Sequence, residues 1–174
     1  MADTFDACLT FTLQQEGGFV NNPKDPGGAT NFGITLGVLR TFQHNPGLGV
    51  NDIRNIAQAT VKAIYMANYW NRMRCDALPA GVDLMVFDHG VNAGPARGGR
   101  SLQAALGFAP ADQDGAIGPN TISAATAADP TAVVNAMAAN HEAYYRSLAS
   151  FADFGNGWLA RLARRKQAAL AMIG

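Results

Sequence analysis

The sequence predicts an all-α fold of about seven or eight helices. Apolar residues recur at helical spacing along most of the chain, and glycine and proline pairs separate these stretches. The chain has 174 residues, of which 48% are hydrophobic and 15% charged, so it is long enough to bury a core of its own. No stretch repeats, and none is low in complexity.

The first helix is expected to begin after Asp3 or Thr4, either of which can cap it, and to end before Gly17 and Gly18. Residues 19–33 then contain two prolines, three glycines and three asparagines. This composition indicates an irregular loop or a short hairpin after the first helix.

The stretch 82–91, VDLMVFDHGV, is apolar over most of its length and is expected to form a buried central helix. Pro130 follows Asp129 at a helix start, where proline is tolerated. Helices are also expected over residues 35–44, 56–70, 96–106, 119–128, 131–150 and 157–172.

Basic and acidic residues number 13 each, so the chain as a whole has no strong attraction to nucleic acid or to an anionic membrane. No apolar run approaches the roughly 18 residues of a membrane span. The amino-terminal residues lack the basic segment of a conventional signal peptide, so we expect synthesis in the cytoplasm. Cys8 and Cys75 match no metal-ligand spacing and are expected to be buried free thiols, with one disulfide as the alternative.

Glu16 is the first candidate catalytic residue. It ends the first helix, where unpaired backbone carbonyls carry partial negative charge and disfavour a second negative charge beside them. A carboxylic acid that keeps its proton near neutral pH is what a glycosidase needs to protonate a leaving-group oxygen. Gly17 and Gly18 remove side chains that would screen this acid from a polymer.

Asp25 is the second candidate, with Thr30 beside it. Pro23 and Pro26 flank Asp25 and restrict its backbone, which would hold a short carboxylate at a fixed place. Inverting glycosidases need two carboxyl groups roughly 6.5–9.5 Å apart, with a water molecule between the base and the sugar. Thr30 would hold that water. The alternative is an ordinary helix end followed by a proline turn.

The stretch EGGFVNNPKDPGGATNFGIT, residues 16–35, resembles the opening motif of glycoside hydrolase family 108, the N-acetylmuramidases of phage endolysins and related bacterial proteins. The resemblance continues in YW at 69–70 and FDHGVNAG at 87–94. The matching positions in the opening motif are Glu16, Gly17, Gly18, Asn21, Pro23, Asp25, Pro26, Gly27, Gly28, Thr30, Gly33, Ile34 and Thr35.

The resemblance implies a lysozyme-like fold, with Glu16 as the catalytic acid. The order of Glu16, Asp25 and Thr30 also looks like the catalytic set of T-even phage lysozyme, but the last gap is one residue shorter. Thr35 therefore stays open as the counterpart of the lysozyme threonine, or as a substrate contact. Residues 1–93 would form the muramidase region.

Residues 102–124, LQAALGFAPADQDGAIGPNTISA, resemble a peptidoglycan-binding pattern. The resemblance implies that residues 94–174 form a helical, peptidoglycan-binding-like region packed into the same lobe. The alternative is that this segment does not bind peptidoglycan itself and only builds the second wall of the catalytic cleft.

Three further residues are candidate substrate contacts. Asp88 and Asn92 are four residues apart and share one face of the 82–91 helix and its continuation, where they would bind sugar hydroxyls or satisfy buried backbone groups. Tyr69, with Trp70, would stack on sugar rings, although aromatic residues at a helix end favour the core. No metal site is expected, because the histidines are scattered and Asp112 and Asp114 lack the glutamate that ends a calcium loop.

The last helix carries Arg161, Arg164, Arg165 and Lys166 beside apolar residues. We expect a closing helix with a solvated basic face. The alternative is weak contact with an anionic membrane surface.

These observations predict a monomeric peptidoglycan hydrolase that cleaves the β-1,4 bond between N-acetylmuramic acid and N-acetylglucosamine without a metal or organic cofactor. The resemblance suggests an endolysin that acts in the periplasm or cell wall after holin-mediated release. The alternatives are a lytic transglycosylase, a secreted muramidase effector and a non-catalytic wall-binding module.

Overall fold

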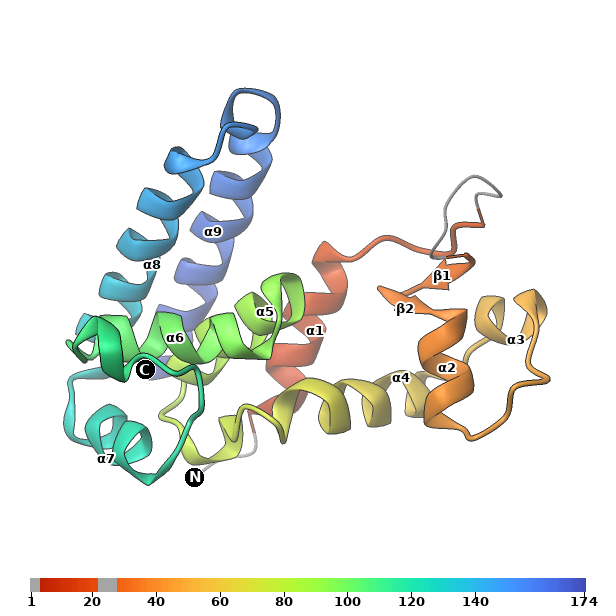
Figure 1. Ribbon diagram of the computed structural model, residues 1–174, viewed down its shortest axis with the longest axis horizontal. Coiled ribbons are helices and arrows are strands. Elements are labelled where there is room, and N and C mark those ends of the chain that lie inside the picture. The colour runs from red at the N-terminus through yellow and green to blue at the C-terminus, as the bar shows by residue number, and fades with distance from the viewer. Residues whose placement is uncertain (1–3, 22–27) are drawn as a thin grey trace. The chain divides into compact units, whose positions relative to one another are not determined.

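The computed structural model describes residues 4–21 and 28–174, which form nine α-helices and one two-stranded sheet (Figure 1). The all-α, lysozyme-like prediction is confirmed, and a short hairpin follows the first helix as expected. Within the described residues, no helix has the length and apolar character needed to cross a membrane.

The chain divides into two compact units, which we call the hairpin unit and the helical unit. The hairpin unit is Leu9–Asn68, and the helical unit is Tyr69–Gly174 together with the residues up to Cys8. These units differ from the division at residue 93 expected from the sequence, because the helix at 82–93 packs against the helices that follow it.

The hairpin unit begins within the first helix and ends within a π-helical segment. Its elements are α1 (Phe5–Gln15, from Leu9 onward), β1 (Thr30–Asn31), β2 (Ile34–Thr35), α2 (Leu36–Phe42), α3 (Val50–Arg54), α4 (Gln58–Tyr65) and the start of η1 (Met66–Trp70). The predicted helix over 56–70 is thus α4 followed by one π-helical turn.

Helix α3 was not expected from the sequence. It has only five residues, too few for a periodic apolar pattern, and one buried side chain, Ile53. Its first turn is closed by the Asp52 carboxylate, which accepts a hydrogen bond from the backbone N–H of Gly49 at 2.6 Å. The buried Asn31 amide donates to the carbonyl oxygens of Ile53 and Arg54, at 3.2 and 3.0 Å, and so ties β1 to this helix.

The helical unit is built around α5, as the sequence predicted. Every residue of α5 from Val82 to Gly90 is buried. Gly98 lets α6 approach α5 closely, because a Cβ at Gly98 would lie 2.9 Å from the carbonyl oxygen of Val86. The elements of this unit are η2 (Cys75–Ala77), α5 (Val82–Ala93), α6 (Pro95–Ala105), η3 (Pro110–Asp112), α7 (Pro119–Ala127), α8 (Pro130–Ser147) and α9 (Phe151–Ile173).

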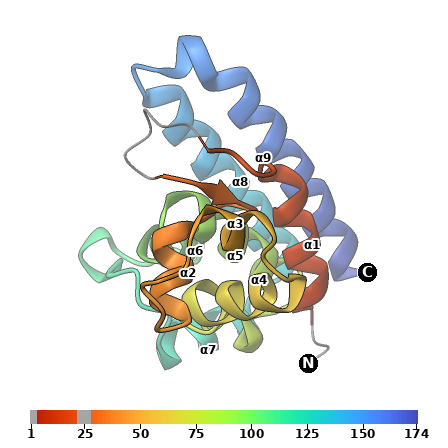
Figure 2. The same cartoon turned by 90° about the vertical axis from the view of Figure 1, so that its right-hand side faces the viewer.

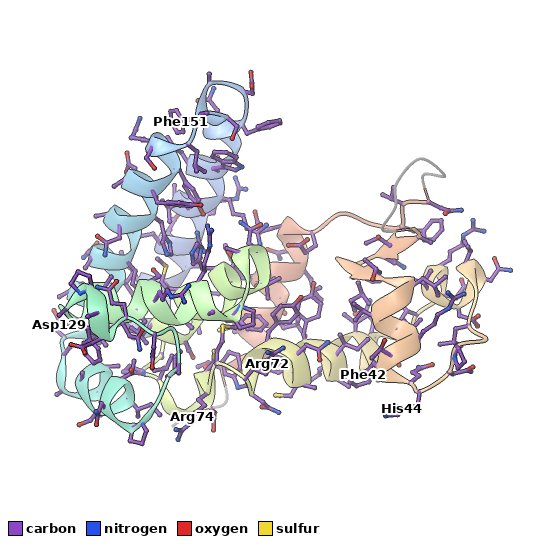
Figure 3. The ribbon with its side chains drawn as sticks, viewed as in Figure 1. Phe42, His44, Arg72, Arg74, Asp129 and Phe151 are labelled. Carbon is purple, nitrogen blue, oxygen red and sulfur yellow. The ribbon has the colours of Figure 1, made fainter. Side chains whose placement is uncertain are left out.

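Helices α8 and α9 lie side by side as a long antiparallel pair (Figures 1 and 2). Figure 3 shows Asp129 and Phe151 at opposite ends of α8. Helix α9 begins at Phe151, whereas the sequence predicted a start at residue 157. Gly155 leaves room for the Phe151 ring, because a Cβ at that position would lie 2.5 Å from it.

An aromatic cluster fills the core of the helical unit near its first residues. The ring of Trp70 meets those of Phe5 and Phe87 edge to face, with centroids 5.1 and 5.4 Å apart. Trp70 is 4% exposed. Trp70 is therefore a core residue. Its position at a helix end favoured this over stacking on a sugar ring.

Cys8 and Cys75 are both buried and both free thiols, as the cysteine count predicted. Burial raises the pKa of each thiol well above its ordinary value, and the charge of Asp83 acts in the same direction. Both are therefore inert, protonated side chains of the core.

Candidate functional site

Glu16 lies where the sequence predicted it, directly after Gln15, the last residue of α1. Its side chain is half-buried, whereas Gly17 and Gly18, which follow, are exposed. No atom of the described residues lies within 4 Å of a Cβ built on either glycine. Neither glycine is therefore required by packing against the described residues.

The turn between β1 and β2 lies against the Glu16 side chain. The two turn residues, Phe32 and Gly33, have φ angles of 49° and 70°, the pair of positive values that a two-residue type I′ hairpin needs. A Cβ at Gly33 would lie 3.1 Å from Oε2 of Glu16. The exposed, side-chain-free face of Gly33 thus faces the candidate acid.

Tyr65 reaches the same turn from the end of α4. Its hydroxyl donates a hydrogen bond to the carbonyl oxygen of Phe32 at 2.8 Å, and it would lie 2.9 Å from a Cβ at Gly33. The side chain is 2% exposed. In the sequence, Tyr65 is one more apolar position of the helix expected over 56–70. The available signal was that a buried tyrosine hydroxyl needs a hydrogen-bond partner.

Thr30 and Thr35 are direct partners across the hairpin, so their side chains lie on the same face of it. Thr35 caps α2, where its hydroxyl oxygen accepts a hydrogen bond from the backbone N–H of Val38 at 3.2 Å. Among residues 4–21 and 28–174, the Thr30 hydroxyl makes a long, 3.4 Å bond to the carbonyl oxygen of Gly28. Thr35 is thus occupied structurally, and Thr30 has the more available hydroxyl.

Asp25 lies outside the described residues. The chain on either side of its segment is joined by two backbone hydrogen bonds of 2.8 Å between Val20 and Thr30. The described residues on the two sides of that segment are therefore held next to each other.

Thr35 also borders a pocket of about 410 Å³ in the hairpin unit. The rest of the pocket is lined by Gly37, Val38, Thr41, Phe42 and Asn68. Tyr69, another candidate substrate contact, is half-buried in the π-helical segment η1.

Asp88 is placed differently from the expectation for a substrate contact. Its side chain has no exposed surface. Its carboxylate accepts hydrogen bonds from Nη2 of Arg161 at 2.8 Å and from Nε of Arg161 at 3.3 Å. Nη1 of Arg165, a residue 1% exposed, lies 3.4 Å from the same carboxylate. Asp88 therefore has an ion-pairing role inside the helical unit, whereas Asn92, one turn later, is exposed.

These ion pairs also correct the expected solvated basic face of the last helix. Arg165 of α9 is buried and Arg161 is only 18% exposed at its side chain, because both turn inward to Asp88. Arg164 is exposed.

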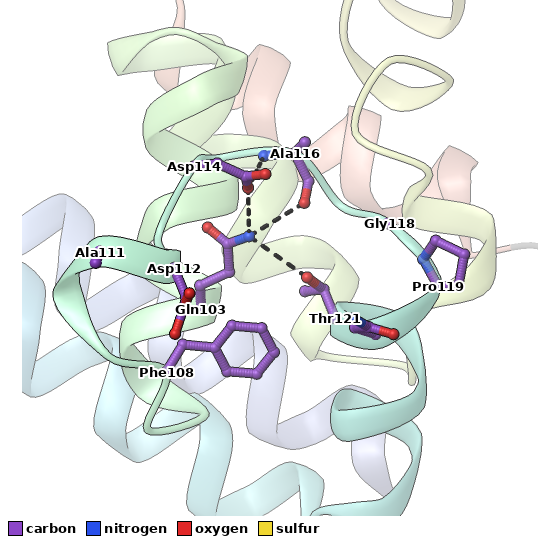
Figure 4. A pocket seen from close by; sticks show the side chains of 10 residues that line it. Gln103, Phe108, Ala111, Asp112, Asp114, Ala116, Gly118, Pro119 and Thr121 are labelled. Atoms are coloured by element: carbon purple, nitrogen blue, oxygen red, sulfur yellow. Dashed lines mark hydrogen bonds between the residues drawn. The ribbon is translucent and has the colours of Figure 1, made fainter.

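A second pocket, of about 740 Å³, lies in the helical unit at the loop between α6 and α7 (Figure 4). The buried Gln103 amide organises this loop by donating to Asp114 Oδ1 and to the Ala116 carbonyl oxygen, at 2.8 and 3.1 Å. Its oxygen accepts from the backbone N–H of Gly115 at 2.8 Å. Hydrogen bonds from Gln103 and from the Ala116 N–H hold the pKa of Asp114 below its ordinary value.

Exposed Asp112 and Asn120 also line this pocket, with the ring of Phe108. A polar pocket with one aromatic wall suits a hydrophilic ligand. Among residues 4–21 and 28–174, no three histidine, cysteine, aspartate or glutamate side chains gather as metal ligands would.

Comparisons with known proteins match two successive regions of the chain, which meet near residue 95 and not at the boundary between the two compact units. The model of the family Glycosyl hydrolase 108 matches residues 9–94, and that of the family "Predicted Peptidoglycan domain" matches residues 97–163. The solved structure of Brucella abortus SagA is similar, with 36% sequence identity, a TM-score of 0.81, and coverage of 98% of this chain and 95% of that one. A comparison with curated protein sequences found no significant match.

The motif around Glu16 falls within the first matched region, and the Gln103 pocket falls within the second. From the two family matches and the likeness over nearly its whole length, the chain belongs to the glycosyl hydrolase 108 family and is a glycoside hydrolase that acts on peptidoglycan.

Proposed function

We propose that this enzyme is an N-acetylmuramidase that cleaves the β-1,4 bond between N-acetylmuramic acid and N-acetylglucosamine, with Glu16 as the general acid. One observation carries the assignment. The half-buried Glu16 carboxyl stands at the end of α1, between the exposed Gly17–Gly18 pair and the exposed face of Gly33. An acid that is partly shielded and yet reachable by a bulky glycan suits proton donation to a glycosidic oxygen.

In this proposal Glu16 protonates the oxygen that leaves with one sugar. Asp25 removes a proton from the attacking water, and the Thr30 hydroxyl orients that water. Thr30 is half-buried, and within the described residues its hydroxyl makes a long bond to the Gly28 carbonyl oxygen, at 3.4 Å, which supports this role. Attack by water on the face opposite the leaving group would invert the anomeric configuration.

The test is product analysis on purified peptidoglycan for the native protein and the Glu16→Gln and Asp25→Asn variants. Loss of a general acid reduces the rate by roughly 10²–10⁴-fold, and we expect Glu16→Gln to fall in that range. The matched control is Glu142→Gln, because Glu16 and Glu142 are the two glutamates of the chain and Glu142 is exposed in the helical unit. Full activity of Glu16→Gln would remove the assignment.

Mass spectrometry of the released fragments separates this activity from that of a lytic transglycosylase. Hydrolysis leaves a reducing N-acetylmuramic acid end, whereas a transglycosylase leaves a 1,6-anhydro ring that is lighter by one water. NMR of the first products reports the anomer, and a retained configuration would exclude Asp25 as the base.

The substrate also sets where this activity is used. Peptidoglycan lies outside the cytoplasmic membrane, so we propose that the enzyme works in the periplasm or cell wall, in the manner of an endolysin. The second pocket, which falls in the peptidoglycan-domain match, supports a further contact with the same polymer.

A further inference from the structure

The pocket at the loop between α6 and α7 contains polar groups whose hydrogen bonds within the described residues are incomplete. Its volume of about 740 Å³ lies within the range of roughly 300–1,000 Å³ that is typical of small-ligand sites. Figure 4 shows the Gln103 amide between Asp114 and Thr121, both of which line the pocket. The groups around this amide indicate which ligand the pocket would take.

Thr121 brings a buried hydroxyl to the pocket, with 2% of the residue exposed. The Gln103 nitrogen lies 3.4 Å from the hydroxyl oxygen, but its two protons have closer acceptors in Asp114 Oδ1 and the Ala116 carbonyl oxygen, at 2.8 and 3.1 Å. Within residues 4–21 and 28–174, the Thr121 hydroxyl donates no hydrogen bond of its own. A buried donor without a partner is costly, so this proton indicates an acceptor that enters the pocket.

The first turn of α7 adds two backbone donors beside that hydroxyl. Gly118, at the N-cap, has no side chain to cap the helix, and Pro119 has no N–H. In the described part of the chain, the N–H groups of Asn120 and Thr121 have no backbone or side-chain acceptor. Free N–H groups at a helix N-terminus favour negative charge, so this part of the pocket suits a carboxylate.

A second part of the pocket is negatively charged. Oδ1 of Asp114 accepts hydrogen bonds from Gln103 Nε2 and from the Ala116 N–H, at 2.8 Å each, and Oδ2 can accept further donors. These bonds hold the pKa of Asp114 below its ordinary value, so it is charged at neutral pH. Exposed Asp112 adds a second carboxylate, and none of the described lining residues is basic. This part therefore suits a cation.

We propose that the pocket binds the zwitterionic end of a peptidoglycan stem peptide, with its ammonium group at Asp112 and Asp114 and its carboxylate at Thr121 and the first turn of α7. One Gln103 nitrogen contacts both Asp114 and Thr121, so the two binding groups are near neighbours. An ammonium and a carboxylate on the same carbon have a matching separation. Diaminopimelate carries such a pair at its side-chain end where the stem peptide is not cross-linked, and its methylene groups would pack on the Phe108 ring.

The charges favour this end of the stem peptide over other parts of the polymer. The carboxylate of muramic acid or of a terminal alanine would face Asp112 and Asp114 without a cation between them. The ammonium of a lysine side chain would leave the Thr121 proton without an acceptor. Arg100 is a base beside this loop, where its Nε donates to the Gln113 carbonyl oxygen at 3.2 Å, and it is not among the described residues of the lining.

This inference rests on the proposed function for the identity of the polymer, and the test uses short peptides that contain no glycosidic bond. Isothermal titration calorimetry measures their binding to the full chain. The peptides are L-Ala–γ-D-Glu followed by meso-diaminopimelate, by L-lysine, or by diaminopimelate that is N-acetylated at its side-chain end. The lysine peptide lacks the carboxylate and the acetylated peptide lacks the ammonium group. The disaccharide of N-acetylglucosamine and N-acetylmuramic acid, without a peptide, is the fourth probe.

We expect the diaminopimelate peptide to bind roughly tenfold more tightly than each of the other three probes. Thr121→Val should weaken its binding about tenfold, and Thr121→Ser, which keeps the hydroxyl, should bind like the native protein. Asp112→Asn should weaken binding about threefold, because this carboxylate is exposed. The matched controls are Thr126→Val, on the exposed face of α7, and Asp153→Asn, exposed in α9, and both should keep the native affinity.

A lysine or acetylated peptide that binds as tightly as the diaminopimelate peptide overturns the inference, as does binding of the disaccharide alone or of none of the four probes. Native affinity in a Thr121→Val protein whose circular dichroism is unchanged also overturns it. Glu16→Gln should keep the native affinity for the diaminopimelate peptide. An active Glu16→Gln enzyme would therefore remove the proposed acid and leave the pocket assigned, whereas a peptide that fails to bind would leave Glu16 as the acid.

Discussion

Asp88 of α5 and Arg161 of α9 form a two-point ion pair, with 2.8 Å between Oδ1 and Nη2 and 3.3 Å between Oδ2 and Nε. The two residues are 73 positions apart in the chain, and the buried Arg165 adds a second guanidinium at 3.4 Å. A buried charge that loses its partner keeps its desolvation cost without compensation.

We therefore expect Asp88→Asn to lower the free energy of unfolding by about 3–5 kcal/mol, because both guanidinium groups would lose their counter-charge. Urea denaturation measures this. The control is Glu142→Gln, which breaks an exposed pair with Arg146 whose side chains are 48% and 54% accessible and should change stability by less than about 0.5 kcal/mol. Equal effects of the two substitutions would contradict the role given to Asp88.

Gly33→Ala should abolish most of the activity. The new methyl group would press on Glu16 Oε2 and the Tyr65 hydroxyl, at 3.1 and 2.9 Å, and move the acid out of place. The substitution also strains the backbone, whose φ is 70°, at a cost of about 1–2 kcal/mol.

Gly28 separates the two effects, because its φ is also 70° but no atom of the described residues lies within 4 Å of a Cβ there. Gly28→Ala should lose similar stability and keep more activity. Thermal unfolding and hydrolysis rates measured on both variants test this. Similar losses of activity in both would show that backbone strain alone is responsible.

Stability should decline as the pH falls below about 6.5, because of two stacked histidines in the helical unit. The rings of His89 and His141 lie 3.9 Å apart between centroids, and each side chain is less than 5% exposed. Burial, followed by the charge of Arg165, lowers the pKa of His89 to about 3. Burial, followed by the neighbouring His89, lowers the pKa of His141 to about 2.

Both imidazoles are thus neutral in the folded protein, whereas the unfolded chain binds their protons below about pH 6.5. The stabilisation is complete above that pH and is lost as the pH falls toward the folded values. Each histidine contributes a slope of about 1.4 kcal/mol per pH unit to the free energy of unfolding.

Urea midpoints between pH 7 and pH 5 measure this slope before most carboxylates titrate. His141→Gln should be less stable but less sensitive to pH, whereas the exposed His44→Asn should keep the native slope. An undiminished slope in His141→Gln would exclude the buried pair as its source.

Thr35→Val and Thr30→Val should fail in different ways. Thr35→Val removes the cap of α2 and should cost about 1 kcal/mol of stability, which Thr35→Ser restores. Thr30→Val should change stability by no more than about 0.5 kcal/mol, since its hydroxyl bond is long, but should lower kcat. Activity lost in a folded Thr35→Val protein and kept in Thr30→Val would transfer the water-orienting role to Thr35.

Local signals in the sequence predicted the backbone around the acid correctly. The glycine pair after Glu16 ends α1, and the turn at 32–33 lies in the stretch expected to form a loop or short hairpin, because both depend on the conformational preferences of a few adjacent residues. Helix α3 was missed for the opposite reason. It is held in part by the Asn31 amide, which comes from a strand about twenty residues earlier.

Long-range contacts decided the roles of individual side chains. Apolar periodicity predicted that the helix carrying Asp88 is buried, but it contains no information about which cation lies beside it. Arg161 and Arg165 looked solvated for the same reason. Tyr65 is one more apolar position in a helical pattern until its hydroxyl is seen beside Phe32 and Gly33.

By itself, the sequence determined the all-α class, the helix that ends at the acid, the hairpin after it and the identity of Glu16 as the leading candidate. These are properties of short segments, where backbone preferences and hydrophobic spacing dominate. Only the tertiary structure decided that Asp88 is an ion-pair partner, that Thr35 is a cap and that Tyr65 stands beside Glu16. Such roles depend on which distant groups share a few ångströms, and residue spacing along a chain does not encode that distance.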